Sequence, residues 1–134
     1  MKIAAPLLVL AALAASGCAA IPTTPVIDGG PAAVAGSLVR LGQPVWISAQ
    51  LVATPMEVHE DSRCPMNARC VWAGRVVVLT RIDGAGWRET AYLTLGEPHQ
   101  THGTTITLST TEPGRMTGSE IAPSQYRFGY ESGN

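Results

Sequence analysis

The chain has 134 residues, a length that allows one ordinary domain. Its 9 Lys and Arg residues nearly balance its 10 Asp and Glu residues, and the formal net charge of −1 argues against a protein that binds nucleic acid through a basic face. The 3 cysteines are an odd number, so at least one of them has a role other than an internal disulfide.

Residues 1–17 have the features of a bacterial signal peptide. Met1-Lys2 supplies a positive charge, and the apolar run from Ile3 to Ala15 is too short to span a bilayer as a helix. Small residues then lead directly to Cys18. This arrangement resembles the lipobox of bacterial lipoproteins, in which the cysteine is acylated and the peptide before it is removed. The resemblance implies a lipoprotein that carries palmitate or similar acyl chains on Cys18 and uses the lipid bilayer as its first partner.

The residue after Cys18 indicates the membrane. Ala19 is not the Asp that retains lipoproteins in the inner membrane of Gram-negative bacteria, so the resemblance implies an outer-membrane anchor with the domain facing the periplasm. The alternative is an ordinary secretory signal, which would release the protein into the periplasm.

Residues 18–35 have the composition of a tether. They are rich in Pro, Gly, Thr and Ala and show no helical or strand periodicity. Fully extended, the residues after Cys18 would reach at most about 60 Å. We therefore expect the domain to stand clear of the lipid headgroups.

Residues 36–134 alternate polar and apolar residues with a period of two, which predicts strands. The continuous apolar run 76–79 indicates a strand buried on both faces, and Pro55 indicates an edge strand or a bulge. In the strand around Pro55, we expect Val52, Thr54, Met56 and Val58 to share one face. The expected strands lie at 45–47, 51–59, 71–82, 87–95, 104–111 and 125–131. Their number and spacing predict an all-β fold, a small antiparallel β-sandwich, with a small β-barrel as the alternative.

The last expected strand places Tyr126, Phe128 and Tyr130 on one face. Small sandwiches need large side chains inside, so we expect these aromatic rings in the core. The alternative is an exposed stacking surface for a glycan or a protein.

The most distinctive string is Glu60-Asp61-Ser62-Arg63-Cys64-Pro65, followed after four residues by Cys70-Val71-Trp72-Ala73-Gly74. It resembles a family of small bacterial envelope proteins, many of them predicted lipoproteins, that has no assigned activity. The resemblance implies the class of protein and its compartment, and it implies no reaction.

Cys64 and Cys70 are expected to form a disulfide, because the periplasm is oxidising and the loop between them can close. Trp72 points to the same side as Cys70 in a strand, so we expect it to pack on the bridge. Gly74 suggests a bulge or a close backbone approach. The alternative, a redox or metal-binding pair, lacks the C-x-x-C spacing and a second cysteine pair.

The three histidines offer a second hypothesis. His59, His99 and His102, with the carboxylates Glu60 and Asp61, are sufficient ligands for a metal ion if the fold brings them together. His99 and His102 lie in an expected loop, where solvated histidines are common. We therefore predict no cofactor and keep this metal site as an alternative.

No complete catalytic constellation is present, and Glu60 and Asp61 are expected to pair with nearby arginines. The sequence therefore predicts a non-enzymatic, membrane-anchored envelope lipoprotein that binds an envelope protein or a glycan. The candidate interaction loop contains Asp61, Arg63, Arg69 and Trp72. The alternatives are a periplasmic inhibitor that inserts the disulfide loop into an enzyme, and a metal-binding or hydrolytic domain.

Overall fold

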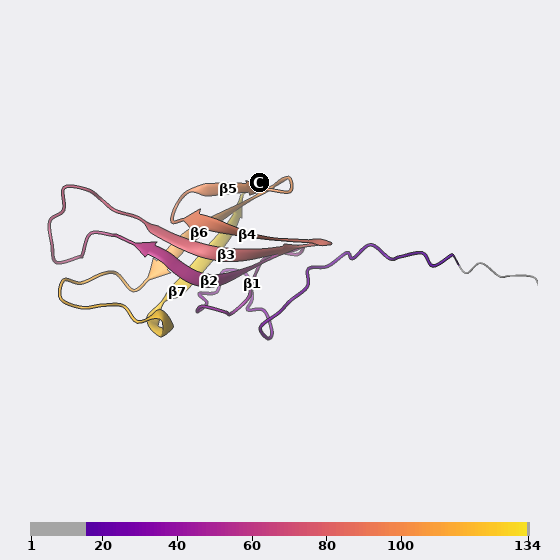
Figure 1. Ribbon diagram of the computed structural model, residues 1–134, viewed down its shortest axis with the longest axis horizontal. Coiled ribbons are helices and arrows are strands. Elements are labelled where there is room, and N and C mark those ends of the chain that lie inside the picture. The colour runs from indigo at the N-terminus through magenta and orange to yellow at the C-terminus, as the bar shows by residue number, and fades with distance from the viewer. Residues whose placement is uncertain (1–15, 134) are drawn as a thin grey trace, which may run out of the picture.

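The computed structural model describes residues 16–133, which form two antiparallel sheets around one core (Figure 1). The first sheet has the order β1-β2-β3-β4, with β1 at Val45–Ser48, β2 at Leu51–Asp61, β3 at Val76–Gly84 and β4 at Trp87–Thr94. The second has the order β5-β6-β7, with β5 at Pro98–Thr101, β6 at Thr104–Glu112 and β7 at Arg127–Gly133. The sheets do not close into a barrel, so the predicted all-β sandwich is confirmed.

Most of the predicted signal peptide, residues 1–15, lies outside the described residues. Within residues 16–133, no helix is long and apolar enough to cross a bilayer. The one short helical turn described there, η1 (Pro123–Gln125), precedes β7. The largest differences from the sequence prediction are that β3 begins at Val76 and not at Val71 and that the expected loop around His99 contains β5. The bounds of the other strands differ from the expected ones by one or two residues.

Two bulges in β2 decide which of its side chains face the core. The register against β3 shifts between Pro55 and Glu57 and again between Val58 and Glu60. Before the first bulge, Ala53 lies opposite Ile82 and both belong to the core; after it, the inner position passes to Val58. The predicted face is therefore wrong, because Val52 and Thr54 point to the opposite side from Val58 and because Met56 is 43% exposed. The proline signal for a bulge is confirmed.

The aromatic residues before and within β7 are buried. Phe128 and Tyr130 belong to the core together with Tyr126, which immediately precedes the strand. The Tyr130 hydroxyl lies 3.0 Å from Thr80 Oγ1, and burial raises the pKa of Tyr130. The core prediction is confirmed, and the alternative of an exposed aromatic surface on this strand is wrong.

The chain before Gly36 is part of the folded unit. Ala33 lies parallel to β1: its N–H donates to Pro44 (2.9 Å), and its carbonyl accepts from Trp46 (2.9 Å). Further upstream, Pro25 is buried, and the Asp28 carbonyl accepts a hydrogen bond from Arg81 (3.1 Å). We refer to residues 25–33 as the clasp.

The clasp covers part of the outer face of the first sheet. Arg81 Nη2, which binds Asp28, also lies 3.4 Å from the Thr54 hydroxyl. Val52, Thr54 and Asp83 all project to this side of the sheet, and each is at most 1% exposed. The second sheet therefore covers the inner face, and the clasp covers the part of the outer face around Thr54 and Asp83, whereas Tyr92 on the same outer face is exposed.

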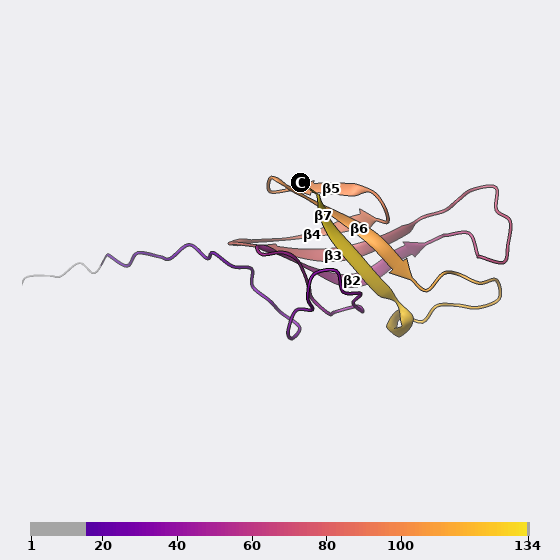
Figure 2. The same cartoon turned by 180° about the vertical axis from the view of Figure 1, so that it is seen from behind.

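The two ends of the sandwich differ. At one end, residues 62–75 between β2 and β3 and residues 113–122 between β6 and η1 extend beyond the strands; we call these segments the paired loops (Figure 1). The N-terminal segment leaves from the opposite end, beside the β3–β4 turn, and the reverse view shows the same arrangement (Figure 2).

Candidate functional site

The loop between β2 and β3 is closed at several levels. The predicted Cys64–Cys70 disulfide is present, with 5.8 Å between the two Cα atoms. Nearer the strands, the N–H of Ser62 donates to the Arg75 carbonyl (2.8 Å) and the N–H of Cys64 donates to Ala73 (3.2 Å). The loop is thus an ordered extension of the sheet.

Gly74 makes this closure possible. Its φ of +68° is in the left-handed region, and a Cβ atom at this position would lie 1.7 Å from the Ser62 carbonyl oxygen. The close backbone approach that the sequence predicted at Gly74 is confirmed.

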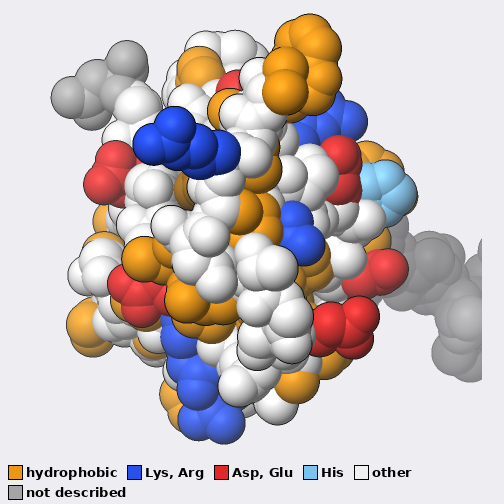
Figure 3. Space-filling view, turned by 90° about the vertical axis from the view of Figure 1, so that its left-hand side faces the viewer, with side chains coloured by type: hydrophobic (Ala, Val, Ile, Leu, Met, Phe, Trp, Pro, Cys, Tyr) orange, Lys and Arg blue, Asp and Glu red, His pale blue; other side chains and the backbone are white. Residues whose placement is uncertain are grey.

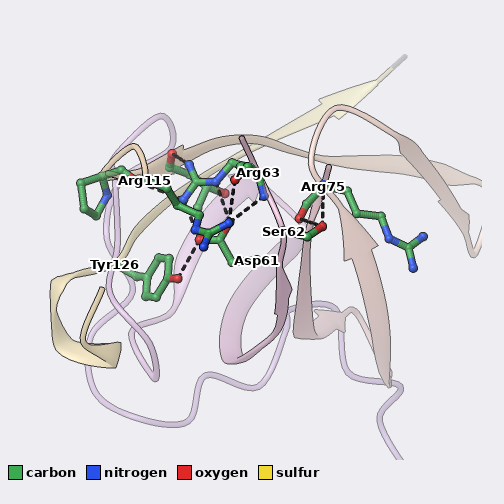
Figure 4. A network of polar contacts seen from close by, with 8 residues as sticks. Asp61, Ser62, Arg63, Arg75, Arg115 and Tyr126 are labelled. Carbon is green, nitrogen blue, oxygen red and sulfur yellow. Dashed lines mark hydrogen bonds and ion pairs between the residues drawn. The ribbon is translucent and has the colours of Figure 1, made fainter. Parts of the chain in front are cut away.

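An ion pair lies where the loop joins the sandwich (Figure 4). The Nε and Nη2 atoms of Arg63 each donate to a different carboxylate oxygen of Asp61, both at 2.8 Å. The Tyr126 hydroxyl donates to the same carboxylate, also at 2.8 Å. The side chains of Asp61 and Arg63 are 8% and 18% exposed, so solvent screens their attraction weakly.

The titration of these groups follows from the geometry. Burial opposes the charged form of Asp61, but the hydrogen bonds from Arg63 and Tyr126 outweigh it and hold the pKa of Asp61 below its ordinary value. The bond to Asp61 raises the pKa of Arg63. Burial, with the bond to Asp61, raises the pKa of Tyr126 to about 12. At neutral pH the cluster is one carboxylate, one guanidinium and one neutral phenol.

Arg63 also joins the two loops. Its Nη1 and Nη2 atoms donate to the carbonyls of Thr111 (3.2 Å) and Pro113 (2.9 Å). In return, Arg115 donates to the Arg63 carbonyl (2.7 Å) and accepts at its own carbonyl from the N–H of Met66 (2.8 Å). The paired loops therefore form one platform.

The predicted carboxylate–arginine cluster is present, although it does not include every arginine. Besides the Asp61–Arg63 pair, Arg75 Nε donates to the Glu60 carboxylate (2.8 Å), and the Ser62 hydroxyl donates to its other oxygen (3.1 Å). These two hydrogen bonds lower the pKa of Glu60. Arg69, the third arginine of the loop, makes no ion pair within residues 16–133.

The paired loops expose several large apolar side chains. Trp72 is 83% exposed and Val71 is 91% exposed, and Met66 and Met116 of the same loops are also exposed. The prediction that Trp72 packs on the disulfide is therefore wrong: β3 begins only at Val76, so the strand geometry behind that prediction does not apply to Trp72. Figure 3 views the molecule from this end and shows hydrophobic side chains on the surface among basic, acidic and other polar groups.

The three predicted metal-binding histidines do not meet. His99 in β5 and His102 in the β5–β6 turn lie on Glu89 of β4, with His99 Nε2 2.9 Å and His102 Nδ1 3.8 Å from its carboxylate oxygens. His59 instead packs against the ring of Tyr92, with 4.7 Å between the centroids. In the part of the chain that the structure describes, no group of three or more His, Cys, Asp or Glu residues is arranged to hold a metal ion.

Sequence reasoning missed Glu89. Burial opposes its charged form, but the hydrogen bonds from His99 and Thr101 hold the pKa of Glu89 below its ordinary value. His102 also stacks on Trp87, with 3.8 Å between the centroids. These contacts link the edge strands of the two sheets, and nothing in the β4 sequence indicates which residue would face β5.

A pocket lies at the opposite end of the sandwich from the paired loops. This pocket, of about 380 Å³, is formed between the N-terminal segment and the β3–β4 hairpin. Its lining comprises Pro22, Val26, Asp83, Gly84, Gly86, Trp87 and Arg88. The pocket lies next to the segment that follows Cys18, whose thiol is exposed and unbridged.

Comparison of the chain with family models, curated proteins and solved structures finds no match. The resemblance of the Cys64–Cys70 string to small envelope proteins therefore stays a prediction. The function has to be argued from the two surfaces described above.

Proposed function

We propose that the protein is a lipid-anchored envelope lipoprotein that binds another envelope protein through the paired loops and has no catalytic activity of its own. One observation carries the proposal: Trp72 is 83% exposed on a loop that a disulfide and Arg63 hold in a fixed conformation. The anchor would be the acylated Cys18 in the outer membrane.

The composition of the platform supports binding. Trp, Met and Arg are enriched in the centres of protein interfaces, and the paired loops expose Trp72, Met66, Met116 and Arg69. Because the loops are already ordered, a partner would bind them with a small loss of conformational entropy. An exposed Trp on a fixed loop gains the most when a partner removes it from water.

The charges indicate the kind of partner. Residues 62–75 contain three arginines and no acidic residue. Two of these arginines are paired with Asp61 and Glu60, which leaves Arg69 to meet an acidic group on the partner. We therefore expect a partner with an apolar hollow and carboxylates at its rim.

The carboxylates favour binding over catalysis. Asp61 accepts two hydrogen bonds from Arg63 and one from Tyr126, and Glu60 accepts from Arg75 and Ser62. Their oxygens hold the platform together and are not free to act as a general base.

A second candidate is inhibition of an envelope hydrolase. The paired loops extend beyond the strands, and a stapled loop that protrudes from a rigid domain fits into an enzyme cleft (Figure 1). This candidate uses the same surface, so the activity of the purified partner distinguishes it from simple binding.

The test is site-specific photo-crosslinking in intact cells. A photoreactive phenylalanine at position 72 should give one discrete crosslinked partner, and the same group at position 92, where Tyr92 is also exposed, should not. With that partner purified, Trp72→Ala should weaken binding about 100-fold without changing the thermal unfolding of the domain. Equal crosslinking from both positions, or unchanged binding by Trp72→Ala, would overturn the proposal.

The anchor is tested separately. The Cys18→Ser variant should lose palmitate labelling and move from the membrane fraction to the periplasmic fraction. Palmitate labelling of this variant would show that the acyl chain lies elsewhere and would reject the lipobox interpretation.

A further inference from the structure

We infer that the β3–β4 hairpin end of the domain lies against the lipid surface and that the clasp holds it there, which directs the paired loops toward the aqueous side. The inference rests on the proposed lipid attachment at Cys18. It adds an orientation and a membrane-facing surface, and both follow from the contacts of the clasp.

The clasp is held by two arginines of the first sheet, Arg81 and Arg88. Arg88 Nη2 donates to the Asp28 carboxylate (2.7 Å), and Arg81 Nη2 donates to the Asp28 carbonyl (3.1 Å). Both arginines also bind Asp83, whose side chain is 2% exposed. A substitution of Asp28 would remove the carboxylate contact with Arg88 but keep the carbonyl contact with Arg81, so the clasp is tied to two arginines that neutralise a buried carboxylate.

The clasp shortens the tether. Pro25, the first buried residue, is only seven residues after Cys18, so the free segment reaches at most about 25 Å. As a coil it spans about 15 Å. The sequence prediction of a reach of about 60 Å counts residues that the structure shows in contact with the domain.

This reach is too short for the domain to turn over. Pro22 and Val26 line a pocket with Gly86 in the β3–β4 turn, so the tether enters at that end. The paired loops begin at the other end of β2, whose 11 residues span about 35 Å. Since about 25 Å of tether cannot bring that far end back to the anchor, the hairpin end faces the bilayer.

The surface at the hairpin end suits an interface with lipid headgroups. Ile21, which precedes the clasp, is 84% exposed, and Val26 within the clasp is 61% exposed. Trp87, half-buried in the same pocket, belongs to a residue type that favours the membrane interface. The ligand at this surface is the membrane that carries the anchor, and the partner of the paired loops approaches from the aqueous side.

The orientation is tested on vesicles of phosphatidylethanolamine and phosphatidylglycerol that contain a maleimide lipid. The chain from Cys18 is coupled through this thiol, since the other two cysteines are bridged. A dye is placed on an unnatural residue at position 85 in the hairpin turn or at position 68 in the disulfide loop. Energy transfer to a headgroup acceptor should be several-fold higher from position 85. Equal transfer, or higher transfer from position 68, would overturn the inference.

Two variants test whether the clasp sets the orientation. Ten Gly and Ser residues inserted after Ala20 should lengthen the tether and reduce the difference between the two dye positions. Asp28→Ala, which removes the exposed ion pair with Arg88 and keeps the carbonyl contact with Arg81, should reduce the difference less. The matched control is Glu97→Ala, which removes an exposed acid without an ion pair among the described residues and should preserve the difference. An unchanged difference after the ten-residue insertion would show that the short tether left by the clasp does not determine orientation.

These outcomes are separate from those of the proposed function. The lipid is attached chemically, so the vesicle experiment reports on orientation even if Cys18 is not acylated in cells. Conversely, loss of palmitate labelling in Cys18→Ser tests the anchor whatever the orientation.

Discussion

Arg63 connects three parts of the chain with one side chain. Its guanidinium binds Asp61 at the end of β2 and the carbonyls of Thr111 and Pro113 in the facing segment. A lysine has one nitrogen and could not make this set of contacts in the same plane. The position of the disulfide loop relative to residues 113–122 therefore depends on a planar cation.

The Asp61→Asn variant should lose about 2 kcal/mol of stability at neutral pH, because Arg63 would be left beside a neutral amide in a mostly buried site. The folded-state pKa of Asp61 is lowered, so its contribution is fully present above the ordinary carboxyl pKa of about 4 and is lost as the pH falls through the lowered value. Urea unfolding of both proteins from pH 7 down to pH 2 measures this.

The control for this experiment is Glu57→Gln, an exposed acid on the same strand without an ion pair in the described chain. It should leave the free energy of unfolding unchanged at each pH. A difference between wild type and Asp61→Asn that stays constant down to pH 2 would contradict the assigned role of the ionised carboxylate.

At the residue scale, the sequence indicates the kinds of partner but not the pairs. Adjacent acids and arginines in one loop predict ion pairs, and the structure contains two of them. Tyr126 is 65 residues from Asp61, and its hydrogen bond to the carboxylate depends on how the two sheets meet. Trp72 is likewise predicted to pack against the disulfide, because a large apolar side chain is usually buried, but its loop extends beyond the strands and leaves it exposed.

At the scale of the elements, β2 shows how two irregular positions change a whole face. An uninterrupted alternation would place Glu57 and His59 on the side that contains Leu51 and Ala53. The bulges remove both polar residues from the inner face and put Val58 there. Pro55 allows the bulge to be predicted from the sequence, but which side chains face the core after the bulge depends on the pairing with β3. The fold class needed only the alternation itself.

The closure of the β2–β3 loop gives a prediction at this scale. Gly74→Ala should destabilise the domain by about 3 kcal/mol or more, because the new methyl group would overlap the Ser62 carbonyl and the backbone would be strained. Gly96→Ala is the matched control: φ at Gly96 is +81°, and a Cβ atom there would meet nothing within 4 Å. Its cost should be about 1 kcal/mol.

Urea unfolding of the two glycine variants separates strain from overlap. Equal losses would mean that the positive φ alone accounts for the effect at Gly74 and that the close approach to Ser62 can relax. In the wild-type protein, reduction of the disulfide should lower the free energy of unfolding by about 2 kcal/mol.

At the scale of the whole molecule, the folded unit begins earlier than its composition indicates. Pro and Gly residues predict a tether because they disfavour helices and strands, yet they are compatible with a segment that crosses a sheet in extended form. Ala33 is held by two backbone hydrogen bonds and Asp28 by two arginine side chains, and these contacts leave no periodic pattern in the sequence. The clasp was therefore not predictable from the sequence, whereas the sandwich was.

A chain that begins at Gly36 should be less stable than one that begins at Thr24 by about 3 kcal/mol. Without the clasp, the outer side of Val52 and the carboxylate of Asp83 would be exposed to water. Denaturation midpoints of the two purified chains provide the measurement. Identical midpoints would show that the clasp contributes nothing to folding.

The short length of β1 has a consequence for proteins crowded on a membrane. Within residues 16–133, β1 pairs with β2 only as far as Ala53 and the Pro55 carbonyl accepts from the N–H of Gly42, so the outer edge of β2 from Met56 to Asp61 has no neighbouring strand. With the proposed lipid anchor, molecules in one bilayer would meet often and side by side, and an open edge invites strand addition between copies. Pro55 lacks an N–H to donate, two bulges break the flat hydrogen-bonding row, and Glu57 and Glu60 add like charges. The bulges that place Val58 on the inner face of β2 thus also disfavour edge-to-edge aggregation with neighbouring copies.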